Sequence, residues 1–156
     1  MVTKKPEAEA TPTGPVPIIE GYFKVPAKPG QTSNLLGNKC KSCGEVFFPA
    51  RVCCRKCSSE DMEPFTFPTV GKLYSFTTIR VKPPHTLMQV PYVVGLVEVE
   101  GGEKVKTLID VKDQKELQIG MDVELVIDVI GKMVEQMGLI KPGQEVLGWK
   151  FRPVKK

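Results

Sequence analysis

Residues 40–57 read CKSCGEVFFPARVCCRKC and contain all five cysteines of this 156-residue chain. Cys40 and Cys43 form one C-x2-C pair, Cys54 and Cys57 form a second, and ten residues separate the two pairs. Each pair can present two sulfur atoms from one tight turn, and two such turns complete the tetrahedral ligand set of structural zinc. The spacing therefore predicts a small zinc-binding ribbon.

The fifth cysteine, Cys53, is left over because only Cys54 keeps two residues between itself and Cys57. We expect Cys53 to be a free thiol. The same four sulfurs could hold iron in a rubredoxin-like site, and this alternative stays open in the sequence. Disulfides are disfavoured in a reducing compartment, and no βαβ pattern of a thioredoxin-like dithiol surrounds the cysteines. A closed four-sulfur site leaves no position for water, so the metal is expected to stabilise the fold and not to catalyse.

The composition and charge of the chain limit the classes of protein to which it can belong. The chain is 41% hydrophobic and carries a formal net charge of +4, which suits one ordinary domain with a small appendage. The nearly balanced charge argues against a polybasic nucleic-acid binder, and no apolar run is long enough to span a membrane. Residues 1–17, MVTKKPEAEATPTGPVP, lack the apolar stretch of a secretory signal and are predicted to be a disordered tail. We therefore expect a cytoplasmic protein.

After the cysteines the pattern is that of a β protein. Alternating or continuous apolar residues predict five strands, with one short helical segment over 113–120. Five short strands fit a closed barrel of the OB-fold type, although a sandwich is a second possibility. The expected division is a tail (1–17), an N-terminal segment with the zinc ribbon (18–69) and a barrel (70–156). The predicted strands cover residues 70–81, 91–100, 103–111, 121–130 and 146–154.

Two segments have a weaker pattern. A short helical turn is expected near Ile18–Phe23, before prolines that favour an extended chain. Residues 131–145 form an excursion between the last two strands, and its apolar side chains suit either a core or a partner-binding surface. Those side chains are Met133, Met137, Leu139 and Ile140.

The first predicted strand leaves a nucleic-acid-binding alternative open. Strict alternation places Leu73, Ser75 and Thr77 on one face and Tyr74 and Phe76 on the other. Two neighbouring exposed rings could stack single-stranded bases, as barrels of this type do. The weak net charge argues against nucleic acid as a partner.

As a set, LLGNKCKSCGEVFFPARVCCRKC, GKLYSFTTI, PYVVGLVEVEGG, IGMDVELVI and WKFRP resemble the acyl-CoA-associated zinc-ribbon/OB-fold proteins. The resemblance covers about residues 18–154. It implies a rubredoxin-like zinc ribbon, with structural Zn²⁺ on the four cysteines named above, followed by a five-stranded OB-fold barrel. Two departures are Ala50, where the family often has a second proline, and the extra thiol of Cys53.

The resemblance also implies a partner. Proteins of this family accompany thiolase-like enzymes or acyl-CoA hydratases, so a hetero-oligomer with a catalytic subunit is expected, with acyl-CoA or coenzyme A near the interface. The complex would cleave a β-keto acyl-CoA with coenzyme A, and benzoylsuccinyl-CoA is one candidate substrate.

The chain itself has few residues for such chemistry. A thiolase needs a nucleophilic cysteine, acid–base groups and an oxyanion hole. Four cysteines are assigned to metal, no base is identifiable beside Cys53, and the only histidine, His85, lies in a proline-bounded loop. We expect no turnover by this chain alone.

Coenzyme A could still contact the chain through its phosphates, which bind Arg and Lys side chains. Candidate contacts are Arg51, Arg80, Lys82 and Arg152, although each could equally lie on a solvated face. Loop 82–91, with Leu87 and Met88 expected to be exposed, is a candidate for docking against a larger enzyme.

Overall fold

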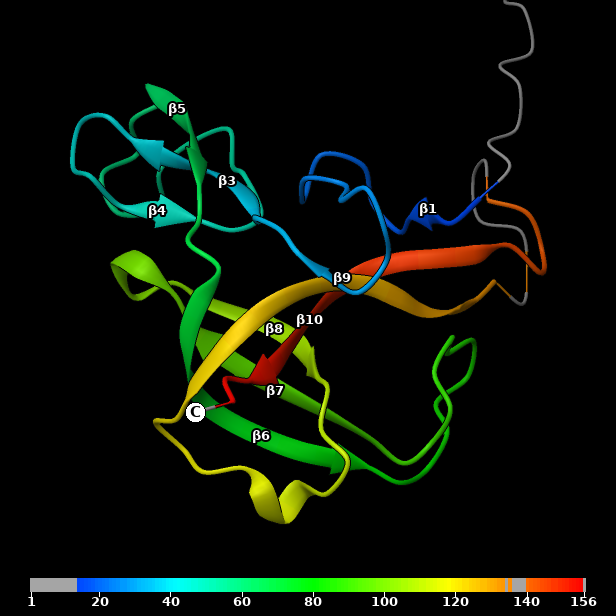
Figure 1. Ribbon diagram of the computed structural model, residues 1–156. Helices are drawn as coiled ribbons and strands as arrows, with labels where there is room; N and C mark the ends of the chain where they lie inside the picture. The colour runs from blue at the N-terminus through cyan, green and yellow to red at the C-terminus, as the bar shows by residue number, and fades with distance from the viewer. Residues whose placement is uncertain (1–13, 134, 136–139, 156) are drawn as a thin grey trace, which may run out of the picture.

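A closed five-stranded barrel forms the larger part of the computed structural model, which describes residues 14–133, 135 and 140–155 (Figure 1). Neighbouring strands pair around the barrel in the order β6-β7-β8-β10-β9 and back to β6, with only the β8–β10 pair parallel. This closure confirms the OB-fold prediction over a sandwich. The strands are β6 (Val70–Ile79), β7 (Tyr92–Glu98), β8 (Lys104–Ile109), β9 (Asp122–Lys132) and β10 (Glu145–Pro153).

The barrel interior is built by alternate residues of every strand. On β9 the predicted apolar face is confirmed, because Val123, Leu125 and Ile127 are fully buried. Phe151 of β10 pairs with Leu125 and fills the same core. Inward-facing residues of the other strands include Leu73, Val93, Val97, Val105 and Ile109.

Strand β6 departs from the predicted alternation. Its register against β7 shifts between Leu73 and Ser75, so Tyr74 is an extra residue in a β-bulge. A bulge reverses which face each later residue occupies. Phe76 therefore lies opposite Gly95 and packs against the core, whereas Tyr74 is 51% exposed. The predicted two-ring stacking platform is wrong.

The zinc ribbon is a separate three-stranded antiparallel sheet above one end of the barrel (Figure 1). Its strand order is β4 (Val46–Phe47), β3 (Leu36–Cys40), β5 (Met62–Thr66). The ribbon and the barrel share one hydrophobic cluster, since Phe48 and Phe67 are buried together with barrel residues such as Leu73. Trp149 of β10 joins this junction, with its ring 5.6 Å from that of Phe48.

The N-terminal segment is tied to the barrel in two places. β1 (Val16–Pro17) pairs in parallel with β10, and β2 (Gln31–Thr32) pairs with β9. Residues 1–13 of the predicted tail lie outside the described residues, but its last two residues belong to β1. Residues 18–22 form bends and a turn in place of the expected helical turn, and Phe23 forms an isolated antiparallel bridge with Leu35.

Helical structure in the described part of the chain is limited to two 3-10 segments, η1 (Glu100–Gly102) and η2 (Gln114–Glu116). The second lies within the predicted segment 113–120. Neither segment, at three residues, is long enough to cross a membrane. Of the excursion 131–145, Met133 is buried and continues from β9, whereas Met137 and Leu139 lie outside the described residues.

Gly37 of β3 provides a first test of the ribbon. A Cβ at this position would collide with the backbone carbonyl of Phe47 and would lie 2.7 Å from the Phe67 ring. We expect Gly37→Ala to reduce the free energy of unfolding by about 1–3 kcal/mol, as overpacking commonly does. Chemical denaturation measures the change. Gly14→Ala is the matched control, because a Cβ at Gly14 meets no atom within 4 Å; equal stability of the two variants would contradict the prediction.

Candidate functional site

The sulfur atoms of Cys40, Cys43, Cys54 and Cys57 converge at one end of the ribbon. All four lie within 4.8 Å of one another, with 3.6 Å between Cys40 and Cys57 and 3.5 Å between Cys43 and Cys54. A tetrahedral Zn²⁺ with Zn–S bonds of roughly 2.3 Å places its ligands about 3.8 Å apart. The four cysteines are thus positioned to bind a metal ion, consistent with structural zinc.

Two turns of the same design present these sulfurs. In the first, the Gly44 N–H donates to the Cys40 carbonyl (2.9 Å) and Gly44 has φ = 78°. In the second, the Ser58 N–H donates to the Cys54 carbonyl (2.8 Å) and Ser58 has φ = 60°. Positive φ is easy for glycine and costly for serine. The second turn therefore contains a residue in an unfavourable backbone conformation. Binding of Cys54 and Cys57 to one metal ion would help to stabilise that conformation.

Hydrogen bonds, burial and the neighbouring thiols shift the pKa values of Cys40 and Cys57 in opposite directions. The backbone N–H of Cys43 lowers the pKa of Cys40 to about 6. The backbone N–H of Ser59 lowers the pKa of Cys57, but burial and the neighbouring thiols outweigh it and raise that pKa to about 12. One thiolate therefore forms easily while another is suppressed. A divalent cation stabilises all four thiolates together.

The set is closed and suits a structural role. Cys40 and Cys54 are buried, and Cys53 is exposed and outside the quartet, as predicted. The loop between the two turns is held by Asn38, whose side chain donates to the Arg51 carbonyl (2.6 Å) and accepts from the Arg51 N–H (3.1 Å). Four protein sulfurs leave no ligand position for substrate.

The four candidate contacts to coenzyme A lie in different places. The Arg51 guanidinium lies 5.8 Å from the centre of the Phe47 ring. Arg152 on β10 donates to Glu124 (2.6 Å), and Lys82 is exposed in the loop after β6. Arg80 lines a hollow, and none of the other three lines it.

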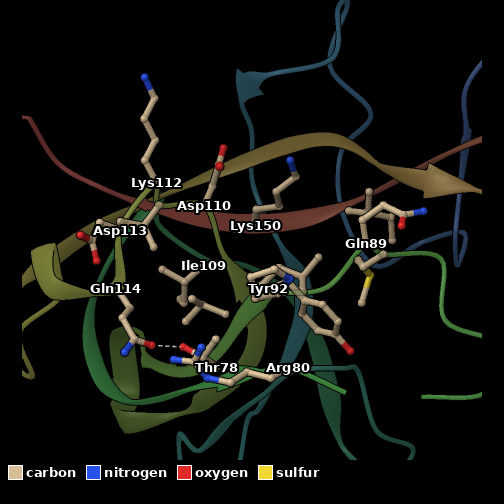
Figure 2. A pocket seen from close by; sticks show the side chains of 16 residues that line it. Thr78, Arg80, Gln89, Tyr92, Ile109, Asp110, Lys112, Asp113, Gln114 and Lys150 are labelled. Atoms are coloured by element: carbon tan, nitrogen blue, oxygen red, sulfur yellow. Dashed lines mark hydrogen bonds between the residues drawn. The ribbon is translucent and has the colours of Figure 1, made fainter. Parts of the chain in front are cut away.

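That hollow, of about 360 Å³, opens at the end of β6 and the start of β7, beside the β8–η2 loop (Figure 2). Arg80 lies near Thr78, whose hydroxyl donates to the Gln114 side chain, while Lys112 extends away from them. Within the described residues Arg80 has no ion pair. It is the one of the four candidates that is both unpaired and beside a cavity.

Loop 82–91 differs from expectation. Leu87 and Met88 are half-buried, because the loop folds down onto the barrel, where a Cβ on Gly131 would collide with the Leu87 carbonyl. His85 remains exposed, with its Nδ1 3.4 Å from a Glu135 carboxylate oxygen. The loop thus forms one wall of a surface hollow.

One residue that sequence reasoning missed is Glu103, which is 9% exposed in the hairpin before β8. Its carboxylate accepts from the Phe48 N–H and from Arg55, at 3.5 Å each. Glu103 therefore links the barrel to the loop and to the second turn of the ribbon. Only its position after the Gly-Gly turn was visible in the sequence.

Comparison with known proteins gives two matching family models. Residues 27–63 match the rubredoxin-like zinc ribbon domain of ChsH2, and residues 66–128 match the C-terminal OB-fold domain of ChsH2. A DUF35 domain-containing scaffold protein of Methanocaldococcus jannaschii is 33% identical over 122 residues, which cover 77% of this chain and 82% of the relative.

Two further relatives have names that point to enzyme assemblies. The benzoylsuccinyl-CoA thiolase subunit BbsA of Thauera aromatica is 33% identical over 95 residues, which cover 61% of this chain and 62% of BbsA. A probable enoyl-CoA hydratase alpha subunit of Thermomonospora curvata is 35% identical over 92 residues, 58% of this chain but only 28% of the relative. Among solved structures, the Ltp2-ChsH2(DUF35) aldolase matches with a TM-score of 0.56 and 28% identity, over 77% of this chain and 84% of that one.

Proposed function

Because the chain belongs to the ChsH2-type zinc-ribbon and OB-fold (DUF35) family, we propose that it is a non-catalytic subunit of a heteromeric thiolase complex. The complex would cleave a β-keto acyl-CoA with coenzyme A in the cytoplasm, and benzoylsuccinyl-CoA is the substrate we name first because a relative is a subunit of that thiolase. The observation that carries the proposal is the closed cysteine quartet. Four of the five thiols are metal ligands in this proposal and are therefore not available as nucleophiles. The fifth thiol, Cys53, is exposed and outside the quartet.

The remaining thiol and imidazole do not supply a catalytic pair. Cys53 lies in the second zinc turn, whereas His85 lies in the β6–β7 loop and contacts Glu135. A nucleophile needs a base within hydrogen-bonding reach. The reaction is therefore assigned to a partner, and this chain to assembly and to holding the acyl-CoA. Arg80 is the favoured contact for a coenzyme A phosphate, ahead of Arg51, Lys82 and Arg152, because it is unpaired and borders a hollow.

The proposal predicts that the thiolase partner loses activity without this chain. We expect an affinity-tagged full-length chain to copurify with an acyl-CoA enzyme from native extract, and the separated partner to cleave benzoylsuccinyl-CoA at least about tenfold more slowly. Adding the zinc-loaded chain back should restore the rate. The measurement is thiolysis followed by the release of the product acyl-CoA, with this chain alone as the blank.

Two results would contradict this. One is a partner that works at full rate without the chain; the other is a copurifying partner that does not act on any CoA thioester. If the copurifying partner is an enoyl-CoA hydratase, the chain would be assigned as an accessory subunit of a hydratase instead of a thiolase.

A further inference from the structure

Two hollows adjoin on the outer face of the barrel, over β7 and β8. The larger, about 390 Å³, lies between loop 85–88 and the strands, and the smaller, about 340 Å³, lies over β6 and β7. They share Val94 and Lys106 in their linings, so they form one continuous groove, called here the outer groove. The second and third barrel strands are β7 and β8, and this is the face on which other OB-fold barrels bind oligonucleotides and oligosaccharides.

The floor of the outer groove is apolar for a structural reason. In β7 the inward positions are Val93, Gly95 and Val97, so Val94 and Leu96 face outward, yet both are only half-exposed. A contiguous, partly exposed apolar patch on a protein surface often marks an interaction site. The other apolar residues that line the groove include Leu87, Met88, Leu108 and Ile130.

The charge of the groove is one-sided. Lys106 is exposed, lies at the junction of the two hollows and has no ion pair within the described residues. Among the described residues, no Asp or Glu lines either hollow, and the other titratable lining group is His85, whose Nδ1 lies 3.4 Å from a Glu135 carboxylate oxygen. Four other cations of the barrel surface are paired with acids, namely Lys72, Lys104, Lys150 and Arg152. An unpaired cation amid apolar side chains is complementary to an acidic group that is itself flanked by apolar side chains.

We propose that the outer groove is the docking surface for a segment of the partner enzyme, in which large apolar side chains flank an acidic one. The apolar side chains fill the two hollows and the carboxylate pairs with Lys106. Charge complementarity is the basis for this occupant, since a basic segment would find no acid in the groove. The proposal deepens the proposed function and rests on it for the kind of partner.

The test uses the full-length, zinc-loaded chain and the partner that copurifies with it. Lys106→Glu and Leu96→Asn are each expected to weaken binding of that partner by at least about tenfold. Lys28→Glu and Ile119→Asn are the matched controls, because both residues are exposed and line neither hollow. The controls should change the affinity less than about twofold. Zinc content and melting temperature show that each variant is folded.

A photo-crosslinking residue at position 106 gives a second readout that does not depend on the variants. The crosslinked peptide of the partner should contain at least one Asp or Glu between large apolar residues. Unchanged affinity of both groove variants, or a crosslinked peptide rich in Lys and Arg, would overturn the proposal. Release of the partner by a single-stranded oligonucleotide that binds the wild-type chain but not the groove variants would also overturn it, because the groove would then hold that ligand.

The outcomes separate the two proposals. If the groove variants lose a partner that is not an acyl-CoA enzyme, the docking surface stands and the proposed function fails. If a thiolase depends on the chain but binds the groove variants normally, the docking surface alone fails. A chain that copurifies with no partner overturns both.

Discussion

Replacing Cys54 with serine is expected to reduce the bound zinc from about one ion per chain to a small fraction and to unfold the ribbon. Cys54 is 1% exposed, and its sulfur is one of four that lie within 4.8 Å of one another. A hydroxyl is a much poorer zinc ligand than a thiolate, and three sulfurs with an open position hold the ion less tightly. Elemental analysis of the purified protein and a thermal melt measure the two effects.

The neighbouring residue supplies the control. Cys53 differs from Cys54 by one position in the chain but is exposed and outside the quartet. We expect Cys53→Ser to keep the full zinc content and the melting temperature of the unmodified chain. Zinc lost equally from both variants would show that the ligand set has been misassigned, and iron in the purified protein, visible as a red colour, would change the metal but not the ligands.

Removing the Phe67 side chain is expected to lower the free energy of unfolding by about 3–5 kcal/mol, the range found for Phe→Ala in cores. Phe67 is fully buried between β5 and β6, where the ribbon meets the barrel. Its ring lies 4.9 Å from that of Phe65 and 6.3 Å from that of Phe48. Alanine would leave a cavity at this junction.

Chemical denaturation followed by far-UV circular dichroism measures the loss. Val52→Ala is the control, since Val52 is 89% exposed and a surface substitution changes stability by only about 0.5 kcal/mol. Because the ribbon and the barrel share one core cluster, we also expect Phe67→Ala to shift the unfolding of both units. A small loss, comparable to that of Val52→Ala, would mean that the ribbon is not anchored through this ring.

Local patterns were enough for the ribbon and for most of the barrel. Two C-x2-C pairs fix which sulfurs can meet, because each pair acts within one turn and needs no distant residue. The clean alternation of Val123, Leu125 and Ile127 predicted a strand with one buried face, and β9 has it. Each of the five predicted strands overlaps an observed one.

Other features depended on contacts between distant residues. The bulge at Tyr74 arises in the pairing of β6 with β7, and nothing in the local sequence sets that register. Val16–Pro17 looked like tail because a two-residue strand has no period of its own and exists only beside β10. Leu87 and Met88 were expected in solvent, but Gly131 on another strand leaves the space into which their loop folds.

The sequence alone determined which four cysteines can meet at one metal ion, where the five strands lie along the chain and that the fold is mainly β, because these follow from spacing and periodicity over a few residues. Only the tertiary structure decided that Glu103 links the barrel to the ribbon, that Arg80 borders a hollow while Arg152 is paired, and that an apolar groove surrounds Lys106. Burial and ion pairing are set by which strands lie side by side after the barrel closes, and that arrangement brings together residues that no local pattern connects.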